Sequence, residues 1–393
     1  MLSGILENMT VREDILKDIK RVVIKIGSSV ISNRDKGRSQ LECGLSREWV
    51  RHYARKIKVI RDKGYDVVLV SSGAIMAGRE RLEFGRADLT VPEKQACAAI
   101  GQSFLMHTYE KAFEKKGLMV AQILLSHDDL GNRRRYLNAK HTIEALLEKG
   151  VIPIINENDS VTVEEIKIGD NDSLSATVAC LVDAQLLIIL SDVEGLYDRD
   201  PSLKNKTEKA QLISHVSKVN EDIEKIAGKS KNRLTVGGML TKVQAAKKTM
   251  SFGIPTLVVN GLDEKVIENI FAGKEVGTLF WSGKGKIRDR KHWIAHTLKP
   301  AGTLTIDEGA RKALVKRGKS LLPAGLIKVK GDFEFGNALT LLDESGKEIG
   351  RGLVNYNSRD LERIKGMKTS AVCSLMEESF YEEVIHRDDL VIF

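Results

Sequence analysis

The feature that most constrains the fold is an alternation, over residues 21–260, of short apolar runs with longer runs of helical spacing. Several helical runs end in Gly, a usual helix stop. Near-continuous apolar strands that alternate with helices are typical of a mainly parallel sheet covered on both faces. We predict a three-layer αβα sandwich with strands at 21–27, 66–71, 119–125, 151–155, 186–191 and 255–260, and helices at 47–64, 92–117, 133–150, 173–183 and 241–253.

The pattern changes after Gly283. A basic connector leads into short β-like segments at 302–306, 326–330, 337–342, 348–353 and 390–393, with one helical stretch at 308–318. Closely spaced short strands separated by Gly and acidic turns indicate a small β-barrel-like module of about 90 residues. We therefore expect a larger domain at 16–282, a basic linker at 283–298 and a small domain at 299–393.

The composition is that of an ordinary globular chain, with 42% apolar and 30% charged residues. The longest unbroken aliphatic stretches are about five residues, whereas a membrane span needs about 20, so we expect none. The N-terminal residues mix charges through their apolar positions, unlike a signal peptide. The four cysteines form no CxxC pair, which predicts neither a disulfide framework nor a cysteine zinc site. A cytoplasmic location is the expectation.

The formal net charge is +8, but the excess is unevenly placed. Residues 282–300 contain six basic residues and one acidic residue, whereas residues 301–393 contain 14 and 15 and carry −1. The remainder of the excess lies in the N-terminal body. A phosphate-handling site or a solvated linker explains this distribution as well as nucleic acid does.

Polar, glycine-containing turns follow most predicted strands, where ligands bind in parallel sheets. The first strand carries Lys25 and runs into Gly27, and the second runs into Ser72 and Gly73. Such turns free backbone N–H groups for an anion. A plain strand-to-loop turn is the alternative at each.

Acids and amides gather after the fourth strand. Asn156, Glu157, Asn158 and Asp159 follow it directly, which indicates either a polar-ligand site or an Asx-rich turn. Residues 167–173 then read KIGDNDS, and the further ligands of an EF-hand are absent. These acids could instead hold lysines or a metal–phosphate complex.

Two later segments have the same character. Ser191 and Asp192 end the fifth strand, where they could meet a nucleotide, and residues 237–242 read GGMLTK at a helix start. There is no Walker A sequence and no GxGxxG. His386-Arg387-Asp388 lacks the downstream residues of a protein-kinase catalytic loop.

Taken together, the strings VVIKIGSSV, SSGAIMAGRE, INENDSV, EIKIGDNDSLSA, SDVEGLYDRDP and GGMLTK resemble the amino acid kinase superfamily and, within it, the glutamate 5-kinases. PAGTLTIDEGA and SLLPAGLIKV resemble the PUA module at the end of bacterial members. The resemblance implies the amino acid kinase fold. It covers over nine-tenths of the chain. One departure is Val236, where the family usually has Thr; it puts in doubt any ATP contact made by a hydroxyl at that position and leaves Lys242 in place.

The resemblance implies ATP-dependent phosphorylation of the side-chain carboxylate of L-glutamate to L-glutamyl 5-phosphate, the first step of proline biosynthesis. A carboxylate nucleophile is ionised at pH 7 and needs no general base, in keeping with the lack of a His in any of these strings. The task left to the protein is to position two anions and to stabilise the charge of the transferring group.

The resemblance also assigns roles to residues. The catalytic group would be Lys25 and Lys242 flanking the phosphoryl group, with Asp170 holding both lysines. Glutamate would meet Ser72, Gly73, Asp159, Asn171, Asn156 and, less firmly, Lys167. ATP would meet Lys25, Gly27, Ser191, Asp192, Gly237, Gly238, Met239, Thr241 and Lys242. Mg²⁺ would be carried by ATP, with no metal ligand from protein side chains.

Partners are likewise only implied. The resemblance implies feedback inhibition by proline, a homodimer or homotetramer, and transfer of the product to glutamyl phosphate reductase. Two alternatives stay open: a sister kinase acting on another carboxylate, and an added RNA-binding or regulatory role through the PUA module. The −1 charge of the C-terminal segment argues against RNA binding, since nucleic-acid affinity depends mainly on phosphate contacts.

Overall fold

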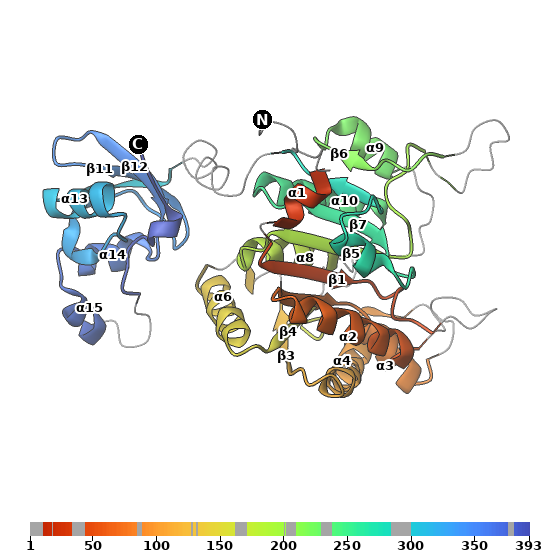
Figure 1. Cartoon of the computed structure of the whole chain (residues 1–393). Helices are drawn as coiled ribbons and strands as arrows, with labels where there is room; N and C mark the ends of the chain where they lie inside the picture. The colour runs from red at the N-terminus through yellow and green to blue at the C-terminus, as the bar shows by residue number, and fades with distance from the viewer. Residues whose placement is uncertain are drawn as a thin grey trace, which may run out of the picture. The chain divides into compact units, whose positions relative to one another are not determined.

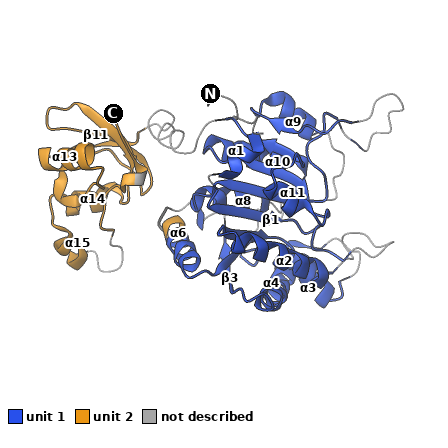
Figure 2. Cartoon of the chain, in the orientation of Figure 1, with its two compact units in different colours: residues 1–130, 138–284 blue, residues 131–137, 285–393 orange. Residues whose placement is uncertain are grey.

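The computed structural model describes residues 11–17, 19–33, 44–84, 89–126, 129–130, 133–161, 171–199, 201, 210–228, 238–283, 300–375 and 381–393. The chain divides into two compact units, residues 1–130 with 138–284 and residues 131–137 with 285–393 (Figure 2). Apart from Gly283, the predicted linker at 283–298 lies outside the described residues.

The first unit is built on an eight-stranded sheet of order β3-β4-β2-β1-β5-β7-β8-β6 (Figure 1). Every neighbouring pair is parallel except β7 and β8. The prediction of a mainly parallel sheet is therefore confirmed. The strands are β1 (Arg21–Ile26), β2 (Asp66–Ser71), β3 (Val120–Leu125), β4 (Ile152–Glu157), β5 (Leu186–Ser191), β6 (His215–Val216), β7 (Thr256–Asn260) and β8 (Thr278–Phe280).

Helices cover both faces of this sheet, and the alternation of side chains along β1 shows how. Val22, Ile24 and Ile26 share one buried cluster with residues of α2, α4 and α11. Lys25 points to the opposite face, where α8 contacts β1. The helices are α1 (Val11–Lys17), α2 (Arg47–Asp62), α3 (Ala74–Arg81), α4 (Val91–Glu114), α6 (Arg133–Glu148), α8 (Asn171–Leu181), α9 (Glu221–Gly228), α10 (Met239–Ser251) and α11 (Val266–Phe271).

Two glycines let α3 and α4 pack backbone against backbone. A Cβ at Gly78 would lie 1.8 Å from the carbonyl oxygen of Cys97, and one at Gly101 would lie 1.8 Å from that of Ala74. No larger residue fits either position without moving a helix. This contact holds the start of α3, which follows β2 directly, against the middle of α4.

The second unit is a five-stranded sheet of order β10-β9-β11-β12-β13. Its pairs are antiparallel except β9 and β11. Leu304, Leu339 and Leu361 are among the side chains of its own buried core. The elements are β9 (Gly302–Ile306), α13 (Glu308–Arg317), η2 (Pro323–Gly325), β10 (Leu326–Lys330), β11 (Ala338–Leu342), β12 (Glu348–Leu353), α14 (Ser358–Ile364), α15 (Thr369–Leu375), η3 (Arg387–Asp389) and β13 (Leu390–Ile392).

Two predicted boundaries near the strand ends are wrong. β4 was expected to stop at Ile155, but it continues through Asn156 and Glu157, which pair with Leu124 and Leu125 of β3. The helix expected from Ser173 begins at Asn171. Both shifts place polar side chains inside regular structure, where their orientation is fixed. Within the described ranges, no helix is long and apolar enough to cross a bilayer.

Candidate active site

The carboxyl ends of β1, β2, β4 and β5 meet at one edge of the sheet because these strands are parallel neighbours. β1 and β5 are neighbours, but the chain goes on from β1 to β2 in one half of the sheet and from β5 to β6 and β7 in the other half. Ligands bind at such a point in open α/β sheets. α8 contacts β1, β2, β4 and β5, and its first turn supplies Asn171 and Asp172.

A buried carboxylate joins the two lysines that the sequence singled out. Lys25 Nζ lies 2.7 Å from Asp172 Oδ1, and Lys242 Nζ lies 3.0 Å from Asp172 Oδ2. Thr241 donates its hydroxyl to the same Oδ2 at 2.8 Å. The three charged side chains are at most 9% exposed. Two ammonium groups from distant parts of the chain thus converge on a single anion, with one positive charge in excess.

The electrostatics keep this cluster ionised. Burial alone would raise the pKa of Asp172, but the ammonium groups of Lys25 and Lys242 more than offset burial and hold the pKa of that carboxyl well below its usual range. Asp172 also lies in the first turn of α8, where the helix dipole favours an anion. The carboxylate is therefore a fixed negative charge that orients two cations.

A chain of neutral hydrogen bonds begins one residue earlier, at Asn171. Its Nδ2 donates to Ser72 Oγ at 2.8 Å and to Asn156 Oδ1 at 2.9 Å. Asn156 Nδ2 donates to Gln102 Oε1 at 2.8 Å, and Gln102 Nε2 donates to Gln122 Oε1 at 2.9 Å. Asn171 Oδ1 is buried and has no hydrogen-bond partner within the described part of the chain, so it can accept from a ligand.

A cavity of about 650 Å³ adjoins this amide chain. Gln102 and Gln122 form part of its wall, together with three carboxylates, Glu110, Glu157 and Asp159. Of the residues predicted to bind glutamate, Asp159 lines the cavity, whereas Asn156 reaches its wall through Gln102. A cavity with several carboxylates and amides suits a small zwitterion that carries an ammonium group.

Residues expected near ATP surround the lysine cluster on two sides. Gly27 is so close to Lys25 that a Cβ there would lie 3.6 Å from Nζ, and its N–H donates to Leu190 O of β5. Ser191 Oγ donates to Asp192 Oδ1 at 3.4 Å at the end of β5. Gly238 is the N-cap of α10, and Met239 is its first residue, about one turn before Lys242.

Some of the predicted site residues lie outside the described part of the chain. Within the described residues, the carboxylate that holds both lysines is Asp172; the role was predicted for Asp170, which the structure does not describe. Asp170, Lys167, Val236 and Gly237 lie outside the described residues. Thr241, which was expected to contact ATP, donates its hydroxyl to Asp172. Gly73 precedes α3 with φ 109°, a left-handed conformation that favours glycine.

Sequence reasoning missed Gln102 and Gln122. Gln102 lies on a helix whose neighbouring residues are mostly apolar, and Gln122 lies within β3. In each case, a glutamine within a mostly apolar run was the one feature of the sequence that could have indicated a buried polar contact. In the described ranges, no group of three or more His, Cys, Asp or Glu side chains is placed to hold a metal ion.

The comparison with known families agrees with this geometry. The model of the amino acid kinase family matches residues 20–260, which include the lysine cluster and the amide chain. This chain belongs to the amino acid kinase family. The model of the PUA domain matches residues 302–374 within the second unit.

Relatives within the amino acid kinase family match almost the whole chain. A glutamate 5-kinase of Geobacter sulfurreducens is 46% identical over 97% of this chain and 100% of its own length. One of Caldanaerobacter subterraneus is 46% identical over 95% and 97%. Among solved structures, a UMP kinase from Bacillus anthracis covers 68% of this chain and 97% of its own, with 17% identity and a TM-score of 0.44.

Proposed function

We propose that this chain is a glutamate 5-kinase, which transfers the γ-phosphoryl group of ATP to the side-chain carboxylate of L-glutamate. The product is L-glutamyl 5-phosphate, the first intermediate of proline biosynthesis. The observation that carries the proposal is the pair of ammonium groups on Asp172, which the amide chain from Asn171 to Gln102 connects to a cavity lined by amides and carboxylates. The near full-length identity to proteins named glutamate 5-kinase supports the choice of acceptor.

The lysine cluster suits phosphoryl transfer. Negative charge spreads over the oxygens of the migrating group, and cations fixed in advance stabilise it without reorganising. Asp172 fixes both ammonium groups, and the positive charge in excess remains for the phosphate oxygens. In the same proposal, Mg²⁺ arrives with ATP, since both oxygens of Asp172 already bond ammonium groups.

The amide chain suits recognition of the amino acid. The glutamate ammonium would meet Asp159, and its other polar groups would meet Ser72 and Asn171 near Gly73. Asn156 acts through Asn171, which it holds by a hydrogen bond of 2.9 Å. Lys167 remains a candidate for the same region. No proton needs removal from the attacking carboxylate, which is ionised at neutral pH.

ATP would lie on the β5 and α10 side of the lysine cluster. Gly27, Ser191 and Asp192 would face the nucleotide from the strand ends. Gly237, Gly238, Met239 and Thr241 would face it from the start of α10. The proposal includes a catalytic domain at 16–282, a linker at 283–298 and a PUA domain at 299–393.

The remaining partners belong to the same proposal. Proline would inhibit by feedback, the chain would assemble as a homodimer or homotetramer, and the product would pass to glutamyl phosphate reductase. The location would be cytoplasmic. RNA binding is not part of the proposal, because residues 301–393 carry a net charge of −1.

The test is ADP release by the full chain with MgATP and each of four acceptors: L-glutamate, N-acetyl-L-glutamate, L-aspartate and carbamate. We expect glutamate to give the highest kcat/KM, and the Lys242→Ala variant to lose that activity. A preference for N-acetyl-L-glutamate or carbamate would show a sister kinase. ADP release that Lys242→Ala leaves unchanged would locate the reaction elsewhere.

A further inference from the structure

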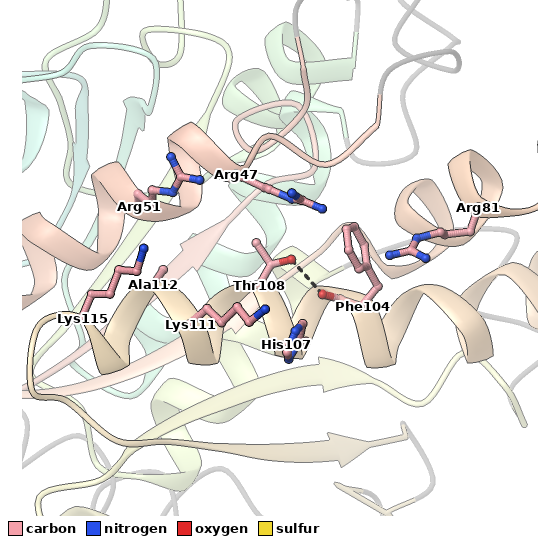
Figure 3. A pocket seen from close by; sticks show the side chains of 9 residues that line it. All are labelled: Arg47, Arg51, Arg81, Phe104, His107, Thr108, Lys111, Ala112 and Lys115. Carbon is pink, nitrogen blue, oxygen red and sulfur yellow. Dashed lines mark hydrogen bonds between the residues drawn. The ribbon is translucent and has the colours of Figure 1, made fainter.

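A second pocket, of about 250 Å³, lies on the outer side of α2, α3 and α4 (Figure 3). Five cations line it: Arg47 and Arg51 of α2, Arg81 of α3, and Lys111 and Lys115 at the end of α4. None of its described lining residues is acidic. The cavity of about 650 Å³ beside the amide chain, in contrast, is lined by three carboxylates. The two hollows therefore have opposite charge.

None of these five cations forms an ion pair within the described part of the chain, although such pairs are common elsewhere on its surface. Like charges gathered in one concavity repel each other, and they concentrate an anion there. Favourable interactions with the helix dipoles do not explain why all five cations lie here. Lys111 and Lys115 suit the end of α4, but Arg47 is the first residue of α2, where the helix dipole disfavours a cation.

An aromatic side chain orders two of the guanidinium groups. Arg81 lies 4.2 Å from the centre of the Phe104 ring, and Arg47 lies 5.6 Å from it (Figure 3). Stacking on a ring uses the flat face of a guanidinium and leaves its N–H edge available. That edge matches the oxygens of a phosphate in a two-point contact. The pocket thus presents preoriented donors.

We propose that this pocket binds a condensed phosphate chain, either the di- or triphosphate tail of a nucleotide or inorganic polyphosphate. Its volume is small for a complete nucleotide, since ligand pockets usually span about 300–1,000 Å³, but it suits the phosphate groups alone. The site is separate from the lysine cluster, and its occupancy does not depend on the proposed kinase activity. His107 lines both this pocket and the cavity of about 650 Å³, so the phosphate site adjoins that cavity across α4.

The test is titration calorimetry of the full chain with inorganic tripolyphosphate, and separately with GTP, at low ionic strength. The pocket variant is Arg51→Gln/Lys111→Gln, which removes one cation from α2 and one from α4 while keeping good helix formers. The matched control is Arg55→Gln/Lys94→Gln, which removes one exposed cation from α2 and one half-buried cation from α4 away from the pocket. Any binding at the lysine cluster is common to all three proteins.

We expect the wild type and the control to show one binding event that the pocket variant loses or weakens at least 10-fold. Tighter binding of GTP than of tripolyphosphate would identify a nucleotide as the source of the phosphates, and the reverse would identify polyphosphate. Equal isotherms for the three proteins would overturn the proposal. A third outcome would also overturn it: the wild type shows no such binding event, and sedimentation shows that the pocket variant has a different oligomeric state from the wild type. Acidic residues of a second copy would then occupy the pocket.

Discussion

The two ends of the candidate active site are built on different physical principles. At the lysine cluster, full charges are buried together, and each depends on the others. Along the amide chain from Asn171 to Gln122, neutral dipoles meet in sequence. A buried ion pair is costly to break on one side, whereas a neutral hydrogen bond contributes little net stability. The charged end therefore suits chemistry on a phosphate, and the neutral end suits the positioning of a small molecule.

The largest expected effect comes from removing the shared anion. Asp172→Asn leaves two ammonium groups buried without their counter-ion, and we expect a loss of about 3–5 kcal/mol in the free energy of unfolding. Urea unfolding measures this. The matched control is Asp183→Asn, which removes a half-exposed carboxylate paired with Lys140 and should cost about 0–1 kcal/mol. Equal losses in both variants would contradict a special role for the cluster.

The same carboxylate sets a pH dependence. Its pKa is depressed in the folded chain, so its stabilisation is present above the unfolded value, about 3.9, and is lost as the pH falls below that value. We expect the stability difference between wild type and Asp172→Asn to be constant from pH 8 to about pH 5 and to shrink below pH 4. A difference that already declines between pH 7 and pH 5 would exclude Asp172 as its source.

Next in size is the loss of either ammonium group. Lys25→Ala or Lys242→Ala should reduce kcat by about 10²–10³, the usual effect of removing one donor to a transition state. Steady-state ADP release measures this, with Lys247→Ala as the control, because Lys247 lies on α10 but pairs with Glu224. Turnover at the wild-type rate in either variant would show that its missing ammonium group does not stabilise the transferring phosphoryl group.

A smaller effect is expected at the neutral end. Asn156→Ala leaves Asn171 and Gln102 each without one partner, at a cost of about 1–3 kcal/mol. We expect the KM for glutamate to rise with little change in the KM for ATP, which initial-rate kinetics in both substrates would show. A larger rise in the KM for ATP would mean that the amide chain also determines ATP binding at the lysine cluster.

The smallest effect is expected at Asp159. Asp159→Asn keeps the shape of the side chain but removes the charge that would face the substrate ammonium, and a loss of about tenfold in glutamate affinity corresponds to roughly 1.4 kcal/mol. The KM for ATP should stay near its wild-type value. Equal changes in the KM for glutamate and the KM for ATP would show that Asp159 does not bind the substrate ammonium.

Much of the fold could be predicted from the sequence because the strands are buried on both faces and read as apolar runs. β2 and β5 match their predicted limits. β8 was missed, since three residues give no pattern, and its antiparallel pairing with β7 depends on contacts distant in the chain. β4 was cut short because Asn156 and Glu157 are polar, although both are buried.

The site shows the same limit. The resemblance implied that one carboxylate holds Lys25 and Lys242 and gave that role to Asp170, whereas nothing in the sequence pointed to Asp172, two residues further on. Asp172 meets both lysines from the first turn of α8, and the start of that helix depends on tertiary packing. Gln102 was missed because a polar residue on a helix is usually solvent-exposed.

Asn171 and Asp172 are consecutive residues of one helical turn, yet one bonds Ser72 while the other bonds the two lysines. If binding of one substrate shifts α8, the shift moves Asn171 and Asp172 together. Binding of glutamate and binding of ATP would then be thermodynamically linked. By reciprocity, whatever factor glutamate adds to the affinity for ATP, ATP must add to the affinity for glutamate.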